Sequence, residues 1–342
     1  MAGYDAFLLV SFGGPEGPAD VIPFLQNVTA GRNIPLARLE QVAEHYYEFG
    51  GVSPINQQCR ELLAAVEEDF AARGVDLPVY WGNRNWDPYL AGTLAEMAAA
   101  GVGRALAFVT SAYSSFSSCR QYLGDIEAAR REVGDNAPQV DKIRQYFNHP
   151  GFISAFAAAA KRAADSLHGD DFDLIFTAHS IPVGMAAASG PAGGAYRAQL
   201  TEAARLVAAE IGHHRPWQLA YSSRSGPPAQ PWLEPDINDL LAERAAAGAR
   251  AVVVVPIGFV SDHMEVKFDL DVEAAQTAHR LGLKFARAAT PGTDPRFVSM
   301  ITDLVRERLD GSAPLALGTL GAGPDSCPAS CCGGGAARPA AR

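Results

Sequence analysis

Runs of apolar residues alternate with segments of helical periodicity along most of this chain. Unbroken apolar runs of about four to eight residues are typical of strands buried on both faces. They predict strands over residues 5–12, 78–82, 104–110, 139–146, 172–177, 218–222, 252–255 and 285–288. Helical periodicity predicts helices over residues 36–47, 56–73, 88–100, 119–133, 151–167, 196–212, 236–247 and 295–309. This alternation indicates an α/β fold with parallel sheets.

The two halves of the chain repeat one plan. The run AEMAAAG at 95–101 is matched by AERAAAG at 242–248, and WGNR at 81–84 is echoed by YSSR at 221–224. We therefore expect two similar Rossmann-like, doubly wound domains, whose parallel sheets present their strand ends to a shared cleft. The expected limits are 4–148 and 149–309, with the last helix packing back on the first domain, and a Gly/Pro/Cys-rich tail over 310–342.

A second alignment brings two residues to the cleft. Aligning Pro15 with Pro182 pairs Phe12 with His179. It predicts that these side chains occupy equivalent points on opposite sides of the cleft. The Gly/Ala-rich segment 184–194, a little further on, is expected to be loose.

The most distinctive stretch is VVVVPIGFVSDHMEVKFDLDVE at 252–273. Its valines predict a buried strand, and the break at 256–259 leads into a helix. Glu265, Asp269 and Glu273 are four residues apart, so they lie on one helical face. Like charges at this spacing repel, which favours a bound cation. A solvated acidic helix face is the alternative interpretation.

Two histidines accompany this acidic row. His179 follows a predicted strand in TAHSIP, and His263 lies two residues before Glu265. Imidazole suits borderline metals such as ferrous iron, and carboxylates suit harder ones. His179 and Glu265 could therefore hold a divalent metal or pass protons to the acidic row. Alternatively, His179 is a hydrogen-bonded structural residue.

Composition narrows the class of protein. The net charge of −10 argues against nucleic acid or anionic lipid as the main partner. The start of the chain has no basic n-region, and no apolar run reaches transmembrane length. Five cysteines, an odd number, do not predict a disulfide framework. We therefore expect a cytoplasmic enzyme without stable membrane insertion.

Four motifs together resemble a known family. They are LLVSFGGP at 8–15, GGVSP at 50–54, TAHSIP at 177–182 and PIGFVSDHME at 256–265. Their residues and order are similar to the ferrochelatase signatures, and the resemblance covers nearly all of residues 4–310. The chain looks most like actinobacterial coproporphyrin III ferrochelatases with a C-terminal iron–sulfur motif.

The resemblance implies a reaction and roles for four residues. Ferrous iron is inserted into a porphyrin in haem biosynthesis, and two pyrrole protons are released. His179 and Glu265 match the catalytic pair at the metal, while Asp269 and Glu273 match the row that handles metal or protons. A monomer is expected, with transient contacts to neighbouring haem-pathway enzymes.

A porphyrin needs apolar walls and hydrogen-bond donors for its carboxylates. The candidates for porphyrin binding are Phe12 as a wall, Ser53, Tyr122 and Arg32 as donors, and His263. Several bacterial relatives carry a tyrosine where this chain has Phe12. Phenylalanine cannot ligate iron, so we do not expect Phe12 to provide an axial ligand to the iron of the product. Core packing is the simpler role for Phe12.

The cysteines form a second feature. Cys327, Cys331 and Cys332 lie within six residues in the tail, a pattern that suggests soft-metal ligation. Similar enzymes with a [2Fe-2S] cluster take a fourth ligand from an internal loop, for which Cys119 is the candidate. Cys59 lies on a predicted helix and reads as a small buried hydrophobe. A zinc knuckle or a disordered reactive segment is the alternative for the tail.

The expected substrates are ferrous iron and coproporphyrin III, because the chain shows no apolar lip or C-terminal membrane segment for collecting a lipid-soluble porphyrin. Protoporphyrin IX is the close alternative. A metal-dependent hydrolase would use His179, His263 and Glu265 around zinc, but these residues do not have the spacing of a zincin motif. A non-catalytic iron–sulfur sensor on the same fold is a further alternative.

Overall fold

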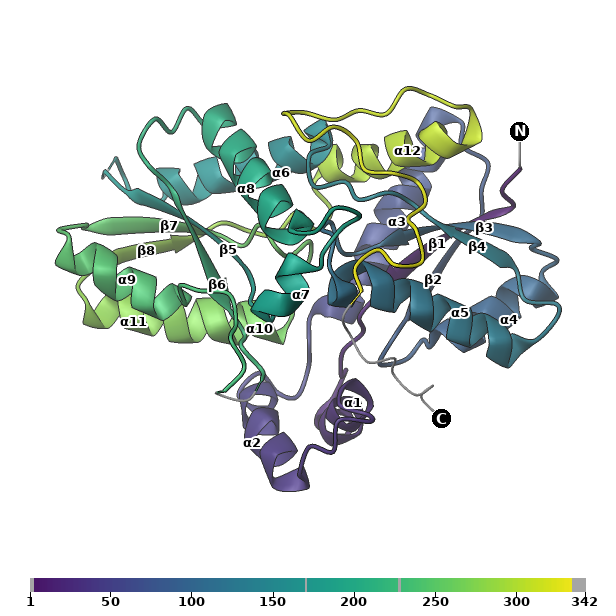
Figure 1. Cartoon of the computed structure of the whole chain (residues 1–342), viewed down its shortest axis with the longest axis horizontal. Helices are drawn as coiled ribbons and strands as arrows, with labels where there is room; N and C mark the ends of the chain where they lie inside the picture. Colours follow the sequence, from purple (N-terminus) through teal and green to yellow (C-terminus); the bar gives the residue numbers. More distant parts are fainter. Residues whose placement is uncertain (1–2, 170, 227–228, 334–342) are drawn as a thin grey trace.

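Two four-stranded parallel sheets form the centre of the protein (Figure 1). The computed structural model describes residues 3–169, 171–226 and 229–333. The strand orders are β2-β1-β3-β4 and β6-β5-β7-β8, so the second sheet repeats the first. The strands are β1 (Ala6–Ser11), β2 (Val79–Asn83), β3 (Arg104–Val109), β4 (Gln139–Lys142), β5 (Asp173–His179), β6 (Gln218–Ser222), β7 (Ala251–Val255) and β8 (Lys284–Arg287).

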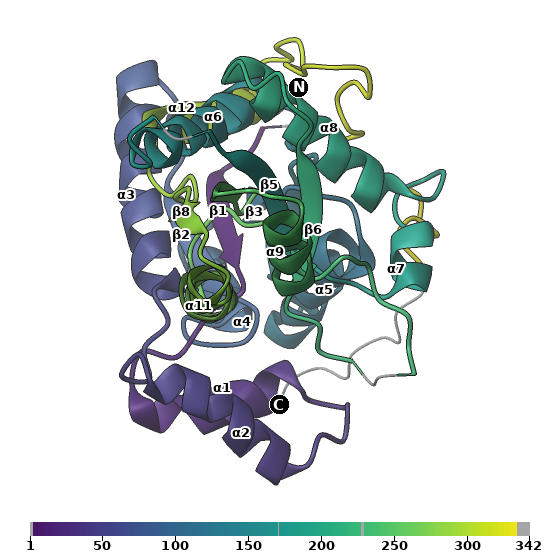
Figure 2. The same ribbon diagram turned by 90° about the vertical axis from the view of Figure 1, so that its left-hand side faces the viewer.

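Helices cover both faces of each sheet (Figures 1 and 2). They are α1 (Val21–Val28), α2 (Leu36–Tyr47), α3 (Ile55–Arg73), α4 (Leu90–Ala99), α5 (Gln121–Val133), α6 (Pro150–Asp165), α7 (Val183–Ala187), α8 (Ala195–Glu210), α9 (Ile237–Ala246), α10 (Met264–Phe268), α11 (Ala275–Arg280) and α12 (Pro295–Leu309). A short 3-10 turn, η1 (Pro18–Asp20), and two π-helical turns, η2 (Phe116–Arg120) and η3 (Asp269–Ala274), join them.

Alternation along the central strands builds two layers of core. In β1, Phe7 and Leu9 face a large core that continues into the second domain, while Ala6, Leu8 and Val10 face a smaller core under α4 and α5. Each large apolar side chain buried in this way contributes about 1.5–3 kcal/mol. The shared core therefore joins the two domains as one folded unit.

Two expectations for local structure need correction. The segment 184–194 is irregular only from residue 188 on, because its first part belongs to α7, whose alanines have the highest helix propensity and outweigh Gly184. The acidic helix after β7 is not one regular helix, because it passes from α10 through η3 into α11. A π turn bonds residues five apart and widens the helix locally. Both differences lie next to the candidate site.

The last helix crosses to the other domain, as expected. α12 packs against α3, where Arg73 donates to the carbonyl and hydroxyl of Ser299 at 2.9 and 2.8 Å. Arg144, just after β4, forms a two-point ion pair with Glu307 on α12 at 2.7 and 2.8 Å. The exact limits of the two domains stay a prediction.

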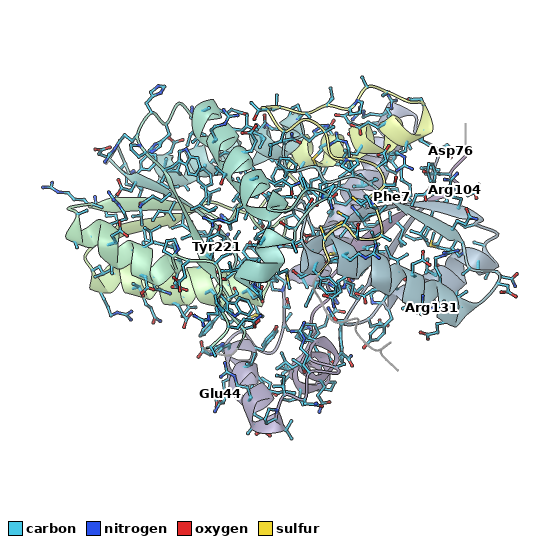
Figure 3. All side chains as sticks on the ribbon, in the orientation of Figure 1. Phe7, Glu44, Asp76, Arg104, Arg131 and Tyr221 are labelled. Atoms are coloured by element: carbon cyan, nitrogen blue, oxygen red, sulfur yellow. The ribbon has the colours of Figure 1, made fainter. Side chains whose placement is uncertain are left out.

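α1 and α2 form a small lobe that projects from the sheets (Figures 1 and 2). Its own apolar cluster includes Phe24 and Leu39, and Figure 3 labels Glu44 on its surface. Ile34 and Leu36, at the turn between the helices, are 39% and 51% exposed. The tip of this small lobe is therefore more apolar than the sequence interpretation allowed.

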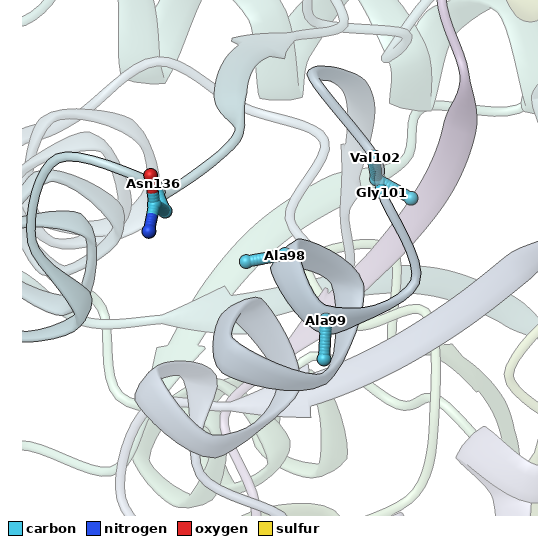
Figure 4. Close-up of a pocket in the computed structure, with 5 residues that line it drawn as sticks. All are labelled: Ala98, Ala99, Gly101, Val102 and Asn136. Carbon is cyan, nitrogen blue, oxygen red and sulfur yellow. The ribbon is translucent and has the colours of Figure 1, made fainter.

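No helix of the described residues is both long and apolar enough to cross a bilayer. A shallow hollow of about 370 Å³ lies beside the end of α4 (Figure 4). It is lined by Ala98, Ala99, Gly101, Val102 and Asn136, so it offers no charged group to a ligand.

The Arg144–Glu307 pair gives a test of the interdomain packing. Both side chains are nearly buried, at 2% and 6% exposure, so Arg144→Met leaves an unpaired carboxylate. We expect a loss of about 3–5 kcal/mol in the free energy of unfolding, measured by urea denaturation. Arg104→Met, at a pair with 30% and 34% exposure, is the matched control and should cost much less, because solvent screens this pair. Equal losses in the two variants would contradict the prediction.

Candidate active site

The candidate site lies at the carboxyl ends of β5 and β7. His179 is the last residue of β5, and Glu265 lies in the first turn of α10, after β7. Gly258 lets the two segments approach, because a Cβ there would lie 2.6 Å from the Cα of Ala178. A glycine is therefore required where the loop after β7 passes the strand that carries His179.

His179 and Glu265 form a close pair. The Nε2 atom of His179 lies 3.3 Å from the Oε1 atom of Glu265. On the other side of the ring, Nδ1 contacts the Ser180 carbonyl, which can only accept a hydrogen bond. Nδ1 must therefore carry a hydrogen, and a hydrogen bond to Glu265 requires a second one on Nε2. The geometry selects a doubly protonated imidazolium beside a carboxylate.

The pKa values of the pair agree with this geometry. Burial alone would lower the pKa of His179, but the charge of Glu265 and hydrogen bonds to Glu265 and Ser180 raise it to about 9. Burial would raise the pKa of Glu265, but His179 holds it at about 2. The two groups therefore share one proton at neutral pH.

A second carboxyl group in the row titrates near neutrality. Burial raises the pKa of Asp269 to about 7, and the charges of Glu265 and Glu273 raise it further. The hydrogen bond from Ser223 acts in the opposite direction and lowers this pKa. Glu273, one turn further, is exposed. The row thus starts at the half-buried pair of His179 and Glu265, continues through Asp269, whose pKa lies near neutrality, and ends at Glu273 on the surface.

Backbone contacts orient both members of the pair. The Tyr196 hydroxyl donates to the His179 carbonyl at 2.8 Å. His263 is the N-cap of α10, and its Nδ1 accepts the Glu265 backbone N–H at 3.2 Å. Since the Nδ1 lone pair of His263 accepts this hydrogen bond, His263 helps to position the backbone of Glu265. The contact of His263 with a porphyrin stays a prediction.

Two residues of the small lobe were missed by sequence reasoning. The ring of His45 stacks on Phe268, at the end of α10, with centroids 3.7 Å apart. Beside it, burial and the charges of Glu265 and Asp269 raise the pKa of Tyr46, so its hydroxyl stays protonated. The HYYEF run at 45–49 precedes the GGVSP motif, which was the one available signal.

Phe12 and Tyr122 lie on either side of one buried cation. The guanidinium of Arg84 lies 5.6 Å from the Phe12 ring and 4.3 Å from the Tyr122 ring, and it pairs with Asp125. Tyr122 is only 5% exposed, and Phe12 also meets Phe24 of the small lobe edge-on. Sequence reasoning missed Arg84.

The strand register supports the equivalence predicted for Phe12 and His179. Ser11 is paired with Asn83, and Ala178 is paired with Tyr221. Asn83 and Tyr221 correspond, because the backbone N–H of each donates to the carbonyl of the next proline along the chain, Pro88 or Pro235. Phe12 and His179, which follow Ser11 and Ala178, therefore occupy equivalent positions. The match of WGNR to YSSR is wrong by two residues, since Asn83 rather than Trp81 corresponds to Tyr221.

The remaining porphyrin candidates lie apart. Ser53 is 4% exposed and packs close to Gly14 in the loop after β1. Arg32 is exposed on the turn after α1. Ser53 thus lies near the end of β1, and Arg32 lies on the small lobe. Their roles stay predictions.

Three cysteines of the tail lie near one another. The Sγ atoms of Cys331 and Cys332 are 3.7 Å apart, and Cys332 accepts the Gly190 N–H at 3.1 Å. Charges on Cys119 and Cys327 contribute to the pKa of Cys332, which burial raises first of all. Cys59 is buried on α3, as expected.

No group of three or more His, Cys, Asp or Glu side chains within 3–169, 171–226 and 229–333 is arranged to hold a metal ion. The cysteines of the tail therefore lie near one another, but the side chains within these ranges do not form a ligand set, and the iron–sulfur motif stays a prediction. The zinc site of the hydrolase alternative gains no support either.

The fold is that of the chelatases. SirB from Bacillus subtilis, solved with Fe³⁺, superposes with a TM-score of 0.51 at 11% sequence identity. The superposition covers 91% of this chain and 97% of SirB. At this identity the likeness concerns the fold alone, namely two α/β domains with parallel sheets.

The chain belongs to the ferrochelatase family. The family model described as Ferrochelatase matches residues 4–309. A coproporphyrin III ferrochelatase of Streptomyces coelicolor is 54% identical, with 99% of this chain and 96% of the relative covered. A ferrochelatase of Rhodopirellula baltica is 55% identical, with 96% and 93% covered. The resemblance read from the four motifs is thus confirmed.

The shared proton can be tested directly. Glu265→Gln removes the charge that raises the pKa of His179, so this pKa should fall from about 9 towards its ordinary value of about 6.5. Because the folded-state pKa of His179 is raised and that of Glu265 is lowered, stabilisation by the pair is complete between about pH 4.5 and 6.5. It is lost as the pH rises through about 9 or falls through about 2. NMR titration of the histidine ring signals measures the change. An unchanged His179 titration would contradict the pairing.

Proposed function

We propose that this protein inserts ferrous iron into coproporphyrin III and releases two pyrrole protons. The observation that carries the proposal is the His179–Glu265 pair, which is half-buried at the strand ends and linked to an acidic row. Membership of the ferrochelatase family and the name of the Streptomyces coelicolor relative support the substrate. The net reaction needs no electron.

Iron enters as substrate at His179 and Glu265. Two protein ligands hold a divalent ion weakly, which suits a metal that must leave in the product. The ion's charge beside Glu265 would cancel the interaction that raises the pKa of His179. The imidazolium would then lose its Nε2 proton. When iron passes to the porphyrin nitrogens it would free the Nε2 lone pair of His179, which can then accept one of the two protons that iron displaces.

The acidic row would carry those protons away. The pKa of Asp269 is about 7, so at neutral pH this carboxyl group can take a proton and give it up with little cost. Ser223 fixes the direction of its carboxyl group, and Glu273 connects it to solvent. Each turnover releases two protons, so a relay that is half-loaded at neutral pH suits the reaction.

The porphyrin would lie between the pair and the small lobe. Phe12 would form part of the wall, while Ser53, Tyr122 and Arg32 are the donors proposed for its carboxylates. Tyr122 would remain neutral, because burial raises its pKa despite the charge of Arg84. A neutral phenol can donate to a carboxylate, whereas a phenolate would repel it.

We further propose that Cys119, Cys327, Cys331 and Cys332 ligate a [2Fe-2S] cluster. Thiolate sulfurs are the ligands that such clusters take, and an N–H donated to a ligating sulfur, as from Gly190 to Cys332, is a common feature of these sites. Burial and the charge of Cys332 raise the pKa of Cys331 strongly, so the thiols are not stable as thiolates without a cation. The bound cluster would tie the tail to the loop that carries Cys119.

Initial rates of anaerobic iron insertion test the function. We expect faster metallation of coproporphyrin III than of protoporphyrin IX, followed by porphyrin absorbance. His179→Ala is the control, and it should lose about 10²-fold or more in rate while still binding porphyrin, since it removes the base. A clear preference for protoporphyrin IX would reverse the substrate assignment. Near-normal turnover by His179→Ala would overturn the mechanism.

The cluster has its own test. Protein purified anaerobically should be brown, with visible absorbance and about two iron atoms per chain. Cys332→Ser should lose the colour, whereas Cys59→Ser, at a buried helical cysteine away from the tail, should keep it. A colourless, fully folded wild-type protein would refute the cluster.

A further inference from the structure

Arg287, the last residue of β8, lies beneath the acidic segment. Its side chain is 14% exposed, and it contacts two carboxylates. It donates to both oxygens of Asp262, at 3.3 and 3.2 Å, and to both oxygens of Asp271, of which one contact is 3.0 Å. One guanidinium thus bridges two acidic residues that are nine positions apart in the chain.

The two carboxylates bound by Arg287 enclose the catalytic part of the segment. Asp262 immediately precedes α10, and Asp271 lies inside the π turn η3. Glu265 and Asp269 lie between them. Since Arg287 belongs to the sheet, this clamp ties both ends of a helical segment to a rigid strand.

Other bonds reinforce each end of this clamp. The Thr290 hydroxyl donates to Asp262 at 3.0 Å, and the Asp262 backbone N–H donates to Gln58 of α3 at 2.8 Å. Lys267 binds Asp271 at 2.8 Å. The bond to Gln58 reaches the other domain, so the clamp also sets the segment relative to the first sheet.

The clamp separates the acidic residues of this segment into two sets. Asp262 and Asp271 point to Arg287, whereas Glu265 points to His179 and Asp269 to Ser223. Arg287 neutralises Asp262 and Asp271, so the charges of these two residues add little to the repulsion among the carboxylates of the row. Glu265 and Asp269 are thereby left to respond to protons and metal.

We propose that Arg287 is a positioning residue for iron insertion, which rests on the function proposed above. By holding Asp262 and Asp271 at once, it fixes the register of α10 and η3. That register keeps Glu265 within 3.3 Å of His179. Lysine cannot replace it, because an ammonium group is a single point of charge and cannot bridge two carboxylates in this fork geometry.

The test compares Arg287→Lys with the wild type and with a matched variant. Arg244→Lys changes another partly buried arginine of the same domain, 27% exposed, whose carboxylate partner is Asp173, away from the site. Arg287→Lys should bind coproporphyrin III as the wild type does. Its KM for ferrous iron should rise and its kcat should fall, so that kcat/KM for iron drops by about 10- to 100-fold. Arg244→Lys should change neither.

Hydrogen exchange gives a readout that does not depend on turnover. The backbone amides of 264–274 should exchange faster in Arg287→Lys than in the wild type, and they should be unaffected in Arg244→Lys. If Arg287→Lys is poorly folded, the triple variant Asp262→Asn/Asp271→Asn/Arg287→Met removes the buried charges together and should show the same local loss of protection.

Three outcomes decide between the possibilities. Unchanged kcat/KM for iron in a folded Arg287→Lys protein would overturn the positioning role. The positioning role would also be overturned if Arg287→Lys lost porphyrin binding and global stability in proportion to its loss of activity, because Arg287 would then have a purely structural role. A wild-type protein that inserts no iron would refute the proposed function instead, while the exchange measurement would still report on the clamp.

Discussion

The proton held between His179 and Glu265 is the interaction on which the rest of the site depends. The Glu265 carboxylate is half-buried, and the imidazolium of His179 places a positive charge 3.3 Å from it. The pKa values of both groups shift in the direction that favours this charged pair, against the effect of burial.

The architecture brings this pair together from two directions. Parallel strands of one sheet deliver His179 and the segment with Glu265 to the same edge, and Gly258 allows them to approach. The small lobe of the other domain then closes on the segment through His45 and Phe268. A rigid connection between domains, through α12 and the shared core, keeps these parts in register.

The carboxylates of the acidic segment differ in their binding partners, and their spacing in the sequence does not reveal these partners. Five carboxylates lie within residues 262–273, and their spacing alone does not say which of them are reactive. Arg287 binds two of them, and His179 and Ser223 bind two others. Burial raises the pKa of Asp269, whereas His179 lowers the pKa of Glu265 against the effect of burial.

The sequence by itself determined the α/β fold, the repeat of the two sheets and the family, because buried parallel strands and strand-end motifs leave strong local patterns. It also determined His179 and Glu265 as a pair. The contributions of Arg287, Tyr46 and Arg84 became visible only in the folded protein, because each depends on contacts with carboxylates that are distant in the chain. The π turn, too, is seen only in the folded protein. Such features depend on packing between distant segments, which leaves no periodic signal in the sequence.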